Sequence, residues 1–397
     1  MVHLLGVSVA SIIGLNVLST LGLLTTQSKP TRTILCAALF GLTGVFQYAF
    51  TTWYQNRMHR GLAASILWAY LLSAAELLLL SEVDLKHAPN PKGNALSSEN
   101  IKWAFFLSWN FRRIGTKWEV RNVPSFGSTF DSKPPSRWEF LRKRLLIVVI
   151  ASLFLDGMTA GPPPDMEMFS EQKQYLNFSR LGQLDTEEAI TRVILTMTIA
   201  LNAALPILIT YYATSIVLVV TGLSMPVDLP PLYGAILECY SVRRFWGNLW
   251  HQWLRRGLTA IATSINTSLA IPRTSNLYRV TMLLSVFFIS GCIHHLSDLA
   301  IGIPQSEATG FYFFMMQPLA IIFEDAFEGI YFQYIRKGKG VEQNLRSWEY
   351  AVCYVWVVLY FTALAPIWFW PLVRHTDPVL DSFLLVRIVP RVIGFMQ

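Results

Sequence analysis

The sequence predicts an all-α, polytopic integral membrane protein with about eight or nine membrane-spanning helices, and three observations support this prediction. Hydrophobic residues make up 53% of the 397 residues and charged residues only 14%, whereas soluble domains contain about 25% charged residues. Thirteen Trp, 15 Tyr and 25 Phe are typical of a protein with a large membrane interface. Several apolar stretches have the length of about 20 residues that a helix needs to cross a bilayer.

These apolar stretches give the predicted spans in chain order. The first has no basic region before it and no small-residue cleavage site, so it is predicted to be a membrane helix and not a cleaved signal peptide. The stretch 189–222 is longer than one span requires and contains Pro206, which allows a kink, a tilt or a split. The predicted spans are residues 4–24, 33–52, 62–80, 142–158, 189–222, 279–302, 309–335 and 348–372, with a short ninth at 383–395.

The charges of the loops predict the orientation of the chain. Residues 81–141, 223–278 and 336–347 are rich in Lys and Arg, whereas residues 157–188 are acidic. Because basic loops stay on the cytosolic side, the first three are predicted to be cytosolic and the fourth lumenal, in the endoplasmic reticulum; the basic loop 57–60 disagrees. The net charge of +7 suits loops beside anionic membrane lipid. Basic residues scattered between apolar spans argue against nucleic-acid binding.

Two N-glycosylation sequons offer a check on this orientation. Asn177-Phe178-Ser179 lies in the predicted lumenal loop, and Asn266-Thr267-Ser268 lies in a predicted cytosolic loop. A glycan on the second sequon and none on the first would contradict the predicted topology.

Residues 243–256 are predicted to form an amphipathic helix at the cytosolic interface. One face collects tryptophans, and the other collects Arg244, Asn248, His251 and Arg255 at spacings of 4, 3 and 4 residues. Either this polar face is simply solvated, as in an anchor helix, or it borders a binding site. In a site, His251 would form hydrogen bonds and the arginines would attract phosphate groups such as those of coenzyme A.

The second candidate site is the apolar stretch 287–296, which carries the adjacent imidazoles of His294 and His295. Polar side chains at membrane depth are costly and usually face a cavity or a partner. A neutral histidine is also suited to moving a proton near pH 7. His294 is therefore a candidate general base.

On a helix through residues 279–302, His294 lies on one stripe with Ser290, Gly291 and Asp298. The two small residues leave room beside the imidazole, and Asp298, one turn away, could orient it. Two other interpretations stay open. The histidine pair could pack helices together through hydrogen bonds to neighbouring spans. A metal site has less support, because adjacent histidines on a helix cannot face one ion and no carboxylate cage accompanies them.

Three acidic residues in the predicted span 309–335 share one side of the helix: Glu324, Asp325 and Glu328. Such acids must face a polar cavity, a cationic partner or solvent at the end of the span, and the sequence assigns them no role. The four cysteines lie far apart without a Cys-x-x-Cys spacing, so neither a zinc site nor a disulfide framework is predicted.

Two motifs and one loop occur in a fixed order along the chain. A Pro-Pro-Leu-Tyr-Gly turn at 230–234 precedes the Phe-Trp-Gly-Asn-Leu-Trp-His run within 241–252, and Ser-Gly-Cys-Ile-His follows at 290–294. Together they resemble the signature of wax-synthase-like membrane-bound O-acyltransferases, whose second motif is Ser-Gly-x-x-His. Residues 110–120 resemble the Arg-Gly-Ile-Gly-Thr loop of fungal members, with Arg113 in place of the first glycine.

This resemblance implies a multi-helix fold that encloses a tunnel, in one transmembrane acyltransferase domain over residues 1–397 with its motif-bearing core at about 100–335. It also implies that acyl-CoA enters from the cytosol and a lipophilic alcohol from the membrane. Fungal relatives of this kind acetylate hydroxyl groups of terpenoid or meroterpenoid natural products. The catalytic histidine of the family maps to His294, and the second motif residue maps to His251. His295 stands where this branch often has Glu.

The predicted reaction is direct transfer of an acetyl group from acetyl-CoA to an alcohol, without a metal. His294 would accept the hydroxyl proton as the oxygen attacks the thioester carbonyl. No Ser or Cys is placed beside it as a nucleophile, so no acyl-enzyme is expected. His251 would help to hold the thioester. The further donor-binding residues are predicted to be Asn248, Arg244, Arg255 and Trp250.

Two alternatives stay open at this point. A long-chain acyl-CoA:alcohol wax-ester synthase would share every motif. A membrane transporter with a histidine proton relay belongs to a different class, although the sequence shows neither repeat symmetry nor a pair of broken helices.

Overall fold

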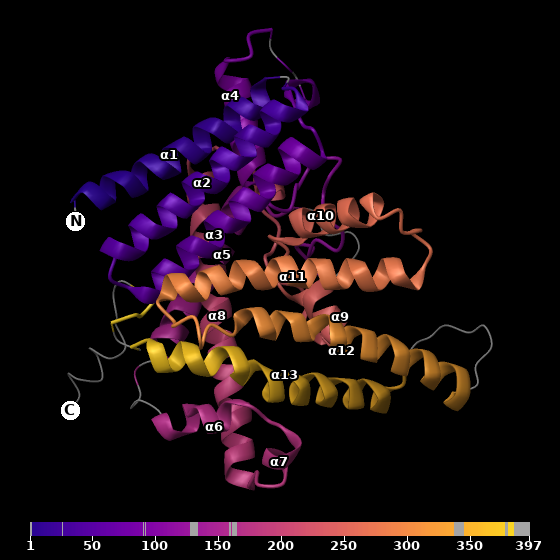
Figure 1. The fold of residues 1–397 in the computed structure, drawn as a ribbon. Coiled ribbons are helices and arrows are strands. Elements are labelled where there is room, and N and C mark those ends of the chain that lie inside the picture. Colours follow the sequence, from indigo (N-terminus) through magenta and orange to yellow (C-terminus); the bar gives the residue numbers. More distant parts are fainter. Residues whose placement is uncertain are drawn as a thin grey trace. The chain divides into compact units, whose positions relative to one another are not determined.

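Every regular element in the described part of the chain is a helix (Figure 1). The computed structural model describes residues 2–25, 27–89, 91, 93–127, 134–158, 160, 165–336, 345–377 and 380–384. The chain groups into two compact units. One comprises Met1–Val120 and Gln252–Pro318, and the other comprises Arg121–His251 and Leu319–Gln397. A single acyltransferase domain over the whole chain stays a prediction.

The longer helices carry most of the apolar sequence. They are α1 (Val2–Leu24), α2 (Lys29–Trp53), α3 (Arg57–Ala75), α4 (Ser98–Trp109), α5 (Arg137–Met158), α8 (Thr186–Val220), α10 (Arg255–Ser268), α11 (Asn276–Ile301), α12 (Gly310–Ile330) and α13 (Ser347–His375). The short helices are α6 (Glu171–Gln174), α7 (Phe178–Leu181) and α9 (Val242–Arg244). Three π-helical turns extend α3, α9 and α12, at Glu76–Leu80, Phe245–Leu249 and Tyr331–Ile335.

Six helices of the described part are long and apolar enough to cross a membrane. They are Val2–Leu24, Lys29–Trp53, Arg57–Leu80, Thr186–Val220, Asn276–Ile301 and Ser347–His375. They coincide with six of the eight predicted spans, which confirms the class of helical membrane protein.

The other predicted spans have different outcomes. The predictions at 142–158 and 309–335 fall on α5 and α12. These helices are less uniformly apolar, because α5 carries basic residues in its first half and α12 carries three acids in its second half. Residues 385–395 of the short ninth span lie outside the described residues. The total of eight or nine spans stays a prediction.

The first unit is built on α1, α2, α3 and α11. The helices α1 and α2 pack on each other, α2 also packs on α3, and α11 lies along α3 (Figure 1). Small residues allow α3 and α11 to approach each other closely, because a Cβ on Gly61 would lie 2.5 Å from the side chain of Ile301. Ser297 donates a hydrogen bond to the Gly61 carbonyl (2.9 Å) and accepts one from Ser65 (2.9 Å). Such polar contacts between small residues hold membrane helices together and fix the position of α11.

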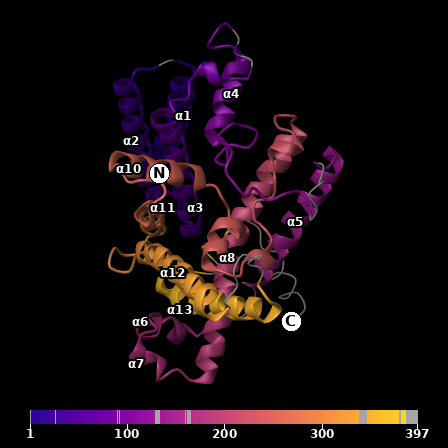
Figure 2. The same cartoon turned by 90° about the vertical axis from the view of Figure 1, so that its right-hand side faces the viewer.

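The second unit contains α5 and α13, each packed against α8; Figure 2 shows α5 alongside α8. The α8 helix runs without a break through Pro206, so the predicted stretch is not split. Its 35 residues extend for about 52 Å at the rise of an α-helix. That exceeds the hydrocarbon thickness of about 30 Å, so α8 must tilt or project beyond the membrane.

The asparagines of the two glycosylation sequons differ in solvent exposure. Asn177 is exposed at the start of α7, where its side-chain oxygen accepts a hydrogen bond from the Arg180 N–H (2.9 Å). Asn266 in α10 is 0% exposed. Its side chain donates to the Ala262 carbonyl (3.2 Å) and accepts from the Thr281 hydroxyl. The folded first unit therefore has no room for a glycan on Asn266.

We predict that the protein made in microsomes carries a glycan on Asn177, because the surrounding loop is predicted to be lumenal. Ser179→Ala should abolish an endoglycosidase-sensitive shift in electrophoretic mobility. Ser268→Ala removes the other sequon at an exposed position and should leave the shift unchanged. A shift that disappears only with Ser268→Ala would contradict the predicted orientation.

Candidate active site

His294 lies where α11 approaches the start of α12 inside the first unit. Ser290 and Gly291 are buried there, and a Cβ on Gly291 would lie 3.0 Å from the ring of Phe311. The missing side chain of glycine therefore permits the close approach. The half-buried imidazole of His294 stacks on the Phe314 ring, with centroids 3.9 Å apart and planes at 23°. This contact fixes the plane of the imidazole.

A hydrogen bond sets the tautomer of His294. Its Nδ1 lies 2.7 Å from the carbonyl oxygen of Ser290, one turn earlier in α11. A carbonyl oxygen only accepts hydrogen bonds, so Nδ1 carries the hydrogen. The Nε2 atom of the neutral ring then keeps its lone pair. This is the protonation state that a general base requires.

The neighbouring polar residues hold the connection between α11 and α12. His295 Nδ1 donates to the Ala308 carbonyl (3.1 Å). Asp298 is 1% exposed and its carboxylate accepts the Gly310 N–H (2.9 Å) at the first residue of α12. Asp298 therefore caps α12, and the suggestion that it also orients His294 stays a prediction. His295 thus attaches α11 to the connection that leads into α12.

The predicted amphipathic helix over residues 243–256 is wrong. The chain forms the short helix Val242–Arg244 and then the π-helical turn Phe245–Leu249. Trp250 follows with extended backbone angles (φ −68°, ψ 152°), and the next helix begins only at Arg255. The residues assigned to one polar face therefore lie on separate segments.

The turn at 230–234 explains this break. The Gly234 N–H donates to the Leu249 carbonyl (3.0 Å), an acceptor that a continuing helix would have used for its next turn. Gly234 lies so close to the preceding carbonyl that a Cβ on it would be 2.1 Å from the Asn248 oxygen. Only glycine fits against the backbone there.

The residues before this break gather within the second unit. The side chain of Asn248 donates to Glu238 (3.0 Å) and accepts from Asn122 (3.1 Å). The guanidinium of Arg244 lies 4.3 Å from the centre of the Tyr240 ring, a distance typical of a cation–π contact. These contacts give both polar side chains defined positions.

Two aromatic rings lie beside His251 in the same unit. Its ring centroid lies 5.3 Å from that of Trp250 and 6.4 Å from that of Tyr233. The Tyr233 hydroxyl donates to the Ala204 carbonyl (2.9 Å), and burial raises the pKa of this phenol above its usual value. His251 therefore packs against aromatic side chains of its own unit. Arg255 and His294 belong to the first unit.

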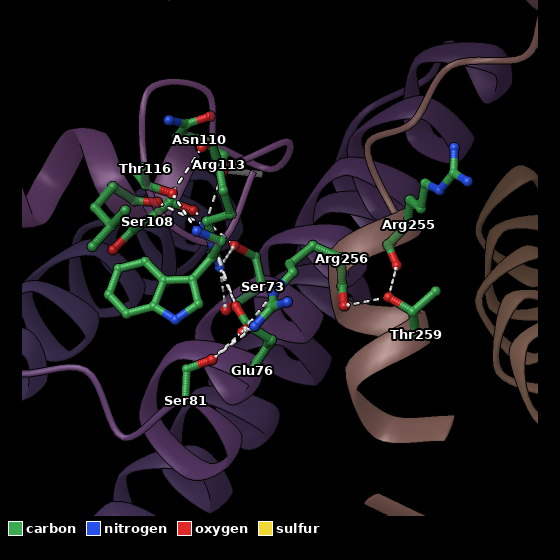
Figure 3. A network of polar contacts seen from close by, with 12 residues as sticks. Ser73, Glu76, Ser81, Ser108, Asn110, Arg113, Thr116, Arg255, Arg256 and Thr259 are labelled. Atoms are coloured by element: carbon green, nitrogen blue, oxygen red, sulfur yellow. Dashed lines mark hydrogen bonds and ion pairs between the residues drawn. The ribbon is translucent and has the colours of Figure 1, made fainter. Parts of the chain in front are cut away.

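Sequence analysis missed Glu76, whose carboxylate is 0% exposed at the start of the π-helical turn after α3. Figure 3 shows it at the centre of a polar network. Arg113 donates to one carboxylate oxygen (Nη2, 2.8 Å), while Arg256 (Nε, 2.9 Å) and Ser81 (2.5 Å) donate to the other. Figure 3 also shows Arg255 pointing away from Glu76. The available signal was a lone acid in a predicted apolar span.

Arg113 adopts a backbone conformation that favours glycine. Its φ is +56°, in the left-handed region that costs a non-glycine residue free energy. Its buried guanidinium makes hydrogen bonds to the carbonyls of Leu107 (2.8 Å), Asn110 (2.9 Å) and Ser73 (3.0 Å) besides its ion pair with Glu76. These bonds offset the backbone strain and hold the loop that follows α4.

The observed helices define an integral membrane protein. One of its apolar helices, α11, carries a histidine, His294, whose tautomer is fixed by a hydrogen bond. Among the described residues, no three His, Cys, Asp or Glu side chains gather closely enough to hold a metal ion. A family model described as "Membrane bound O-acyl transferase family" matches residues 229–316, which contain both motifs.

Curated relatives cover most of the chain. It is 33% identical over 290 residues to acetyltransferase ataH of Aspergillus terreus, spanning 70% of this chain and 91% of the relative. It is 30% identical over 334 residues to acetyltransferase pyr8 of Aspergillus fumigatus (79% and 75%). It is 26% identical over 345 residues to acetyltransferase TRI7 of Fusarium sporotrichioides (83% and 77%). No solved structure matches the chain.

The chain belongs to the membrane-bound O-acyltransferase family and groups with fungal acetyltransferases. This confirms the resemblance and the prediction of an acyltransferase, and it sets the transporter alternative aside. The roles of individual residues stay predictions.

We predict that Glu76→Gln strongly destabilises the protein, because it leaves two arginines facing a neutral amide. Breaking a buried ion pair costs about 3–5 kcal/mol of unfolding free energy, which a denaturation titration in detergent would measure. Glu82→Gln is the matched control, since its partner Lys29 lies 3.5 Å away and both side chains are exposed. Exposed pairs contribute little. Equal stability of the two variants would contradict the proposed importance of Glu76.

Proposed function

We propose that the protein transfers an acetyl group from acetyl-CoA to a hydroxyl group of a lipophilic terpenoid or meroterpenoid in secondary-metabolite biosynthesis. The relatives compared above are fungal acetyltransferases, which supports acetyl-CoA as the donor. The observation that carries the proposal is the hydrogen bond from His294 Nδ1 to the Ser290 carbonyl. It leaves a basic nitrogen on an apolar helix.

In the proposed mechanism, His294 Nε2 accepts the proton of the alcohol while the alcohol oxygen attacks the thioester carbonyl carbon. The carbon–sulfur bond of the resulting tetrahedral intermediate then breaks. The proton passes from His294 to the departing thiolate, and the products are the acetate ester and free coenzyme A. General-base catalysis of this kind contributes about 10²–10⁴-fold to the rate.

The donor is proposed to contact residues on either side of the break after Leu249. His251 would donate or accept a hydrogen bond near the thioester, with Asn248 as a helper, and Trp250 packs beside the His251 ring at 5.3 Å. Arg244 and Arg255 would attract the phosphates of coenzyme A, since one guanidinium group can form two parallel hydrogen bonds to the oxygens of a phosphate.

The proposal includes the wider architecture that the sequence predicted. A fold of eight or nine spans would enclose a tunnel, open to coenzyme A on the cytosolic side of the endoplasmic reticulum and to the alcohol from the membrane. Such a tunnel would exclude water and so protect the thioester from hydrolysis.

The deciding experiment measures release of free coenzyme A from microsomes that contain the protein. Acetyl-CoA with a panel of polycyclic alcohols is compared with palmitoyl-CoA and a fatty alcohol. Turnover only with the long-chain pair would establish the wax-ester synthase instead. Release of coenzyme A from neither pair would refute both functions.

We predict that His294→Ala loses acetyl transfer by about 10²-fold or more, the usual contribution of a general base, while membrane insertion is retained. Cys292→Ala is the matched control two residues away in the same helix. Because no acyl-enzyme is expected, Cys292→Ala should keep its turnover. Wild-type rates for His294→Ala, or loss of activity in Cys292→Ala alone, would reject this assignment.

We predict that Arg244→Ala and Arg255→Ala each raise the apparent KM for acetyl-CoA by about tenfold, the effect of losing one phosphate contact of about 1.4 kcal/mol. The KM for the alcohol should change much less. Steady-state kinetics with each substrate varied in turn measures the difference. Equal changes in both KM values would remove the phosphate-binding role.

A further inference from the structure

The carboxylate of Glu324 in α12 holds the beginning of the motif segment 242–249. One oxygen accepts the Val242 N–H (2.7 Å) and the other accepts the Arg243 N–H (3.2 Å). The indole N–H of Trp356 in α13 donates to the first oxygen (2.8 Å). All of these residues belong to the second unit. Three donors from two segments therefore converge on one carboxylate.

The next acid along α12 contacts the same segment through a side chain. Asp325 forms an ion pair with Arg243, in which Nε lies 3.1 Å from Oδ1 and Nη2 contacts Oδ2. Both partners are exposed, and exposed pairs contribute little to stability. Glu324 is half-buried and holds the segment more strongly than Asp325 does. The first N–H groups of a helix have no acceptor within the helix, and the Glu324 carboxylate accepts charge-assisted hydrogen bonds from them.

The opposite end of the same segment is fixed independently. The Leu249 carbonyl accepts the Gly234 N–H (3.0 Å), and the Phe245 ring lies 4.6 Å from the ring of Phe361 in α13. Glu324 at the start and Gly234 at the end thus determine how the segment lies on the second unit. The orientation of Asn248 and the position of Trp250 depend on both attachments.

We infer that Glu324 is a positioning residue for donor binding: it holds residues 242–249 so that Arg244, Asn248 and His251 meet coenzyme A. The inference rests on the proposed function and extends it to an acid that contacts no substrate. It also gives a role to one member, Glu324, of the acidic cluster to which the sequence assigned none.

The test compares Glu324→Gln with Glu324→Asp and Glu328→Gln in the full-length protein. The amide introduced by Glu324→Gln has one oxygen to accept hydrogen bonds and presents its own N–H groups to the remaining donors. Glu324→Asp keeps the carboxylate on a shorter side chain. Glu328 is exposed one turn further along α12, so Glu328→Gln removes the same charge from the same helix without touching the segment.

We expect Glu324→Gln to raise the KM for acetyl-CoA about tenfold, the equivalent of one lost contact of about 1.4 kcal/mol, with little change in the KM for the alcohol. Glu324→Asp should restore part of the loss, and Glu328→Gln should match the wild type. Hydrogen–deuterium exchange should show faster exchange of the amides of residues 242–249 in Glu324→Gln. Unchanged exchange, or equal changes in both KM values, would overturn the inference.

Binding of coenzyme A, measured by calorimetry, separates this inference from the proposed reaction. A wild type that binds coenzyme A but acetylates no alcohol refutes the reaction. The comparison of coenzyme A affinity between Glu324→Gln and Glu328→Gln still decides the inference in that case. Weaker binding only in Glu324→Gln supports positioning, and equal binding overturns it.

Discussion

The first unit depends on one carboxylate placed where water does not reach it. Glu76 ends an apolar helix, and two arginines from distant segments meet at its two oxygens. An isolated charge at that depth would cost several kcal/mol, so carboxylate and guanidinium groups are stable only together. The Glu76 carboxylate therefore connects the loop after α4, the π-helical turn and the start of α10. The backbone position of Arg255 follows from the attachment of its neighbour Arg256.

The second unit uses an acid for a related purpose with a different kind of partner. Glu324 accepts backbone N–H groups of residues 242 and 243 and an indole N–H, where Glu76 accepts guanidinium groups. In both units a helix with a largely apolar surface supplies one acidic side chain that fixes a polar segment. Apolar packing alone is weakly directional, whereas a carboxylate with several donors has one favoured geometry. The motif segment needs such a fixed geometry because its helix is short and broken.

The sequence was sufficient for the features that depend on local composition. Six of the predicted spans coincide with helices that are long and apolar enough to cross a membrane, because length and apolar content can be read from the sequence. The break at Trp250 could not be predicted, because it depends on a hydrogen bond from Gly234, a residue outside the helical pattern. Glu76 was missed for the same reason: its partners Arg113 and Arg256 lie 37 and 180 residues away. Long-range polar contacts leave no periodic signal.

The spacing of the Ser-Gly-x-x-His motif has a physical explanation in α11. In an α-helix, the carbonyl four residues before a histidine lies one turn below its side chain, and Ser290 supplies that carbonyl to His294. The glycine after the serine lets Phe311 approach, and Phe314, one turn further along α12, stacks on the imidazole. His295 makes the same type of bond to Ala308, outside its own helix. The tautomer of His294 is thus set within one helix, so it is retained if α11 and its neighbours move. The general-base role proposed for His294 requires this tautomer throughout substrate entry and product release, and a bond within one helix supplies it.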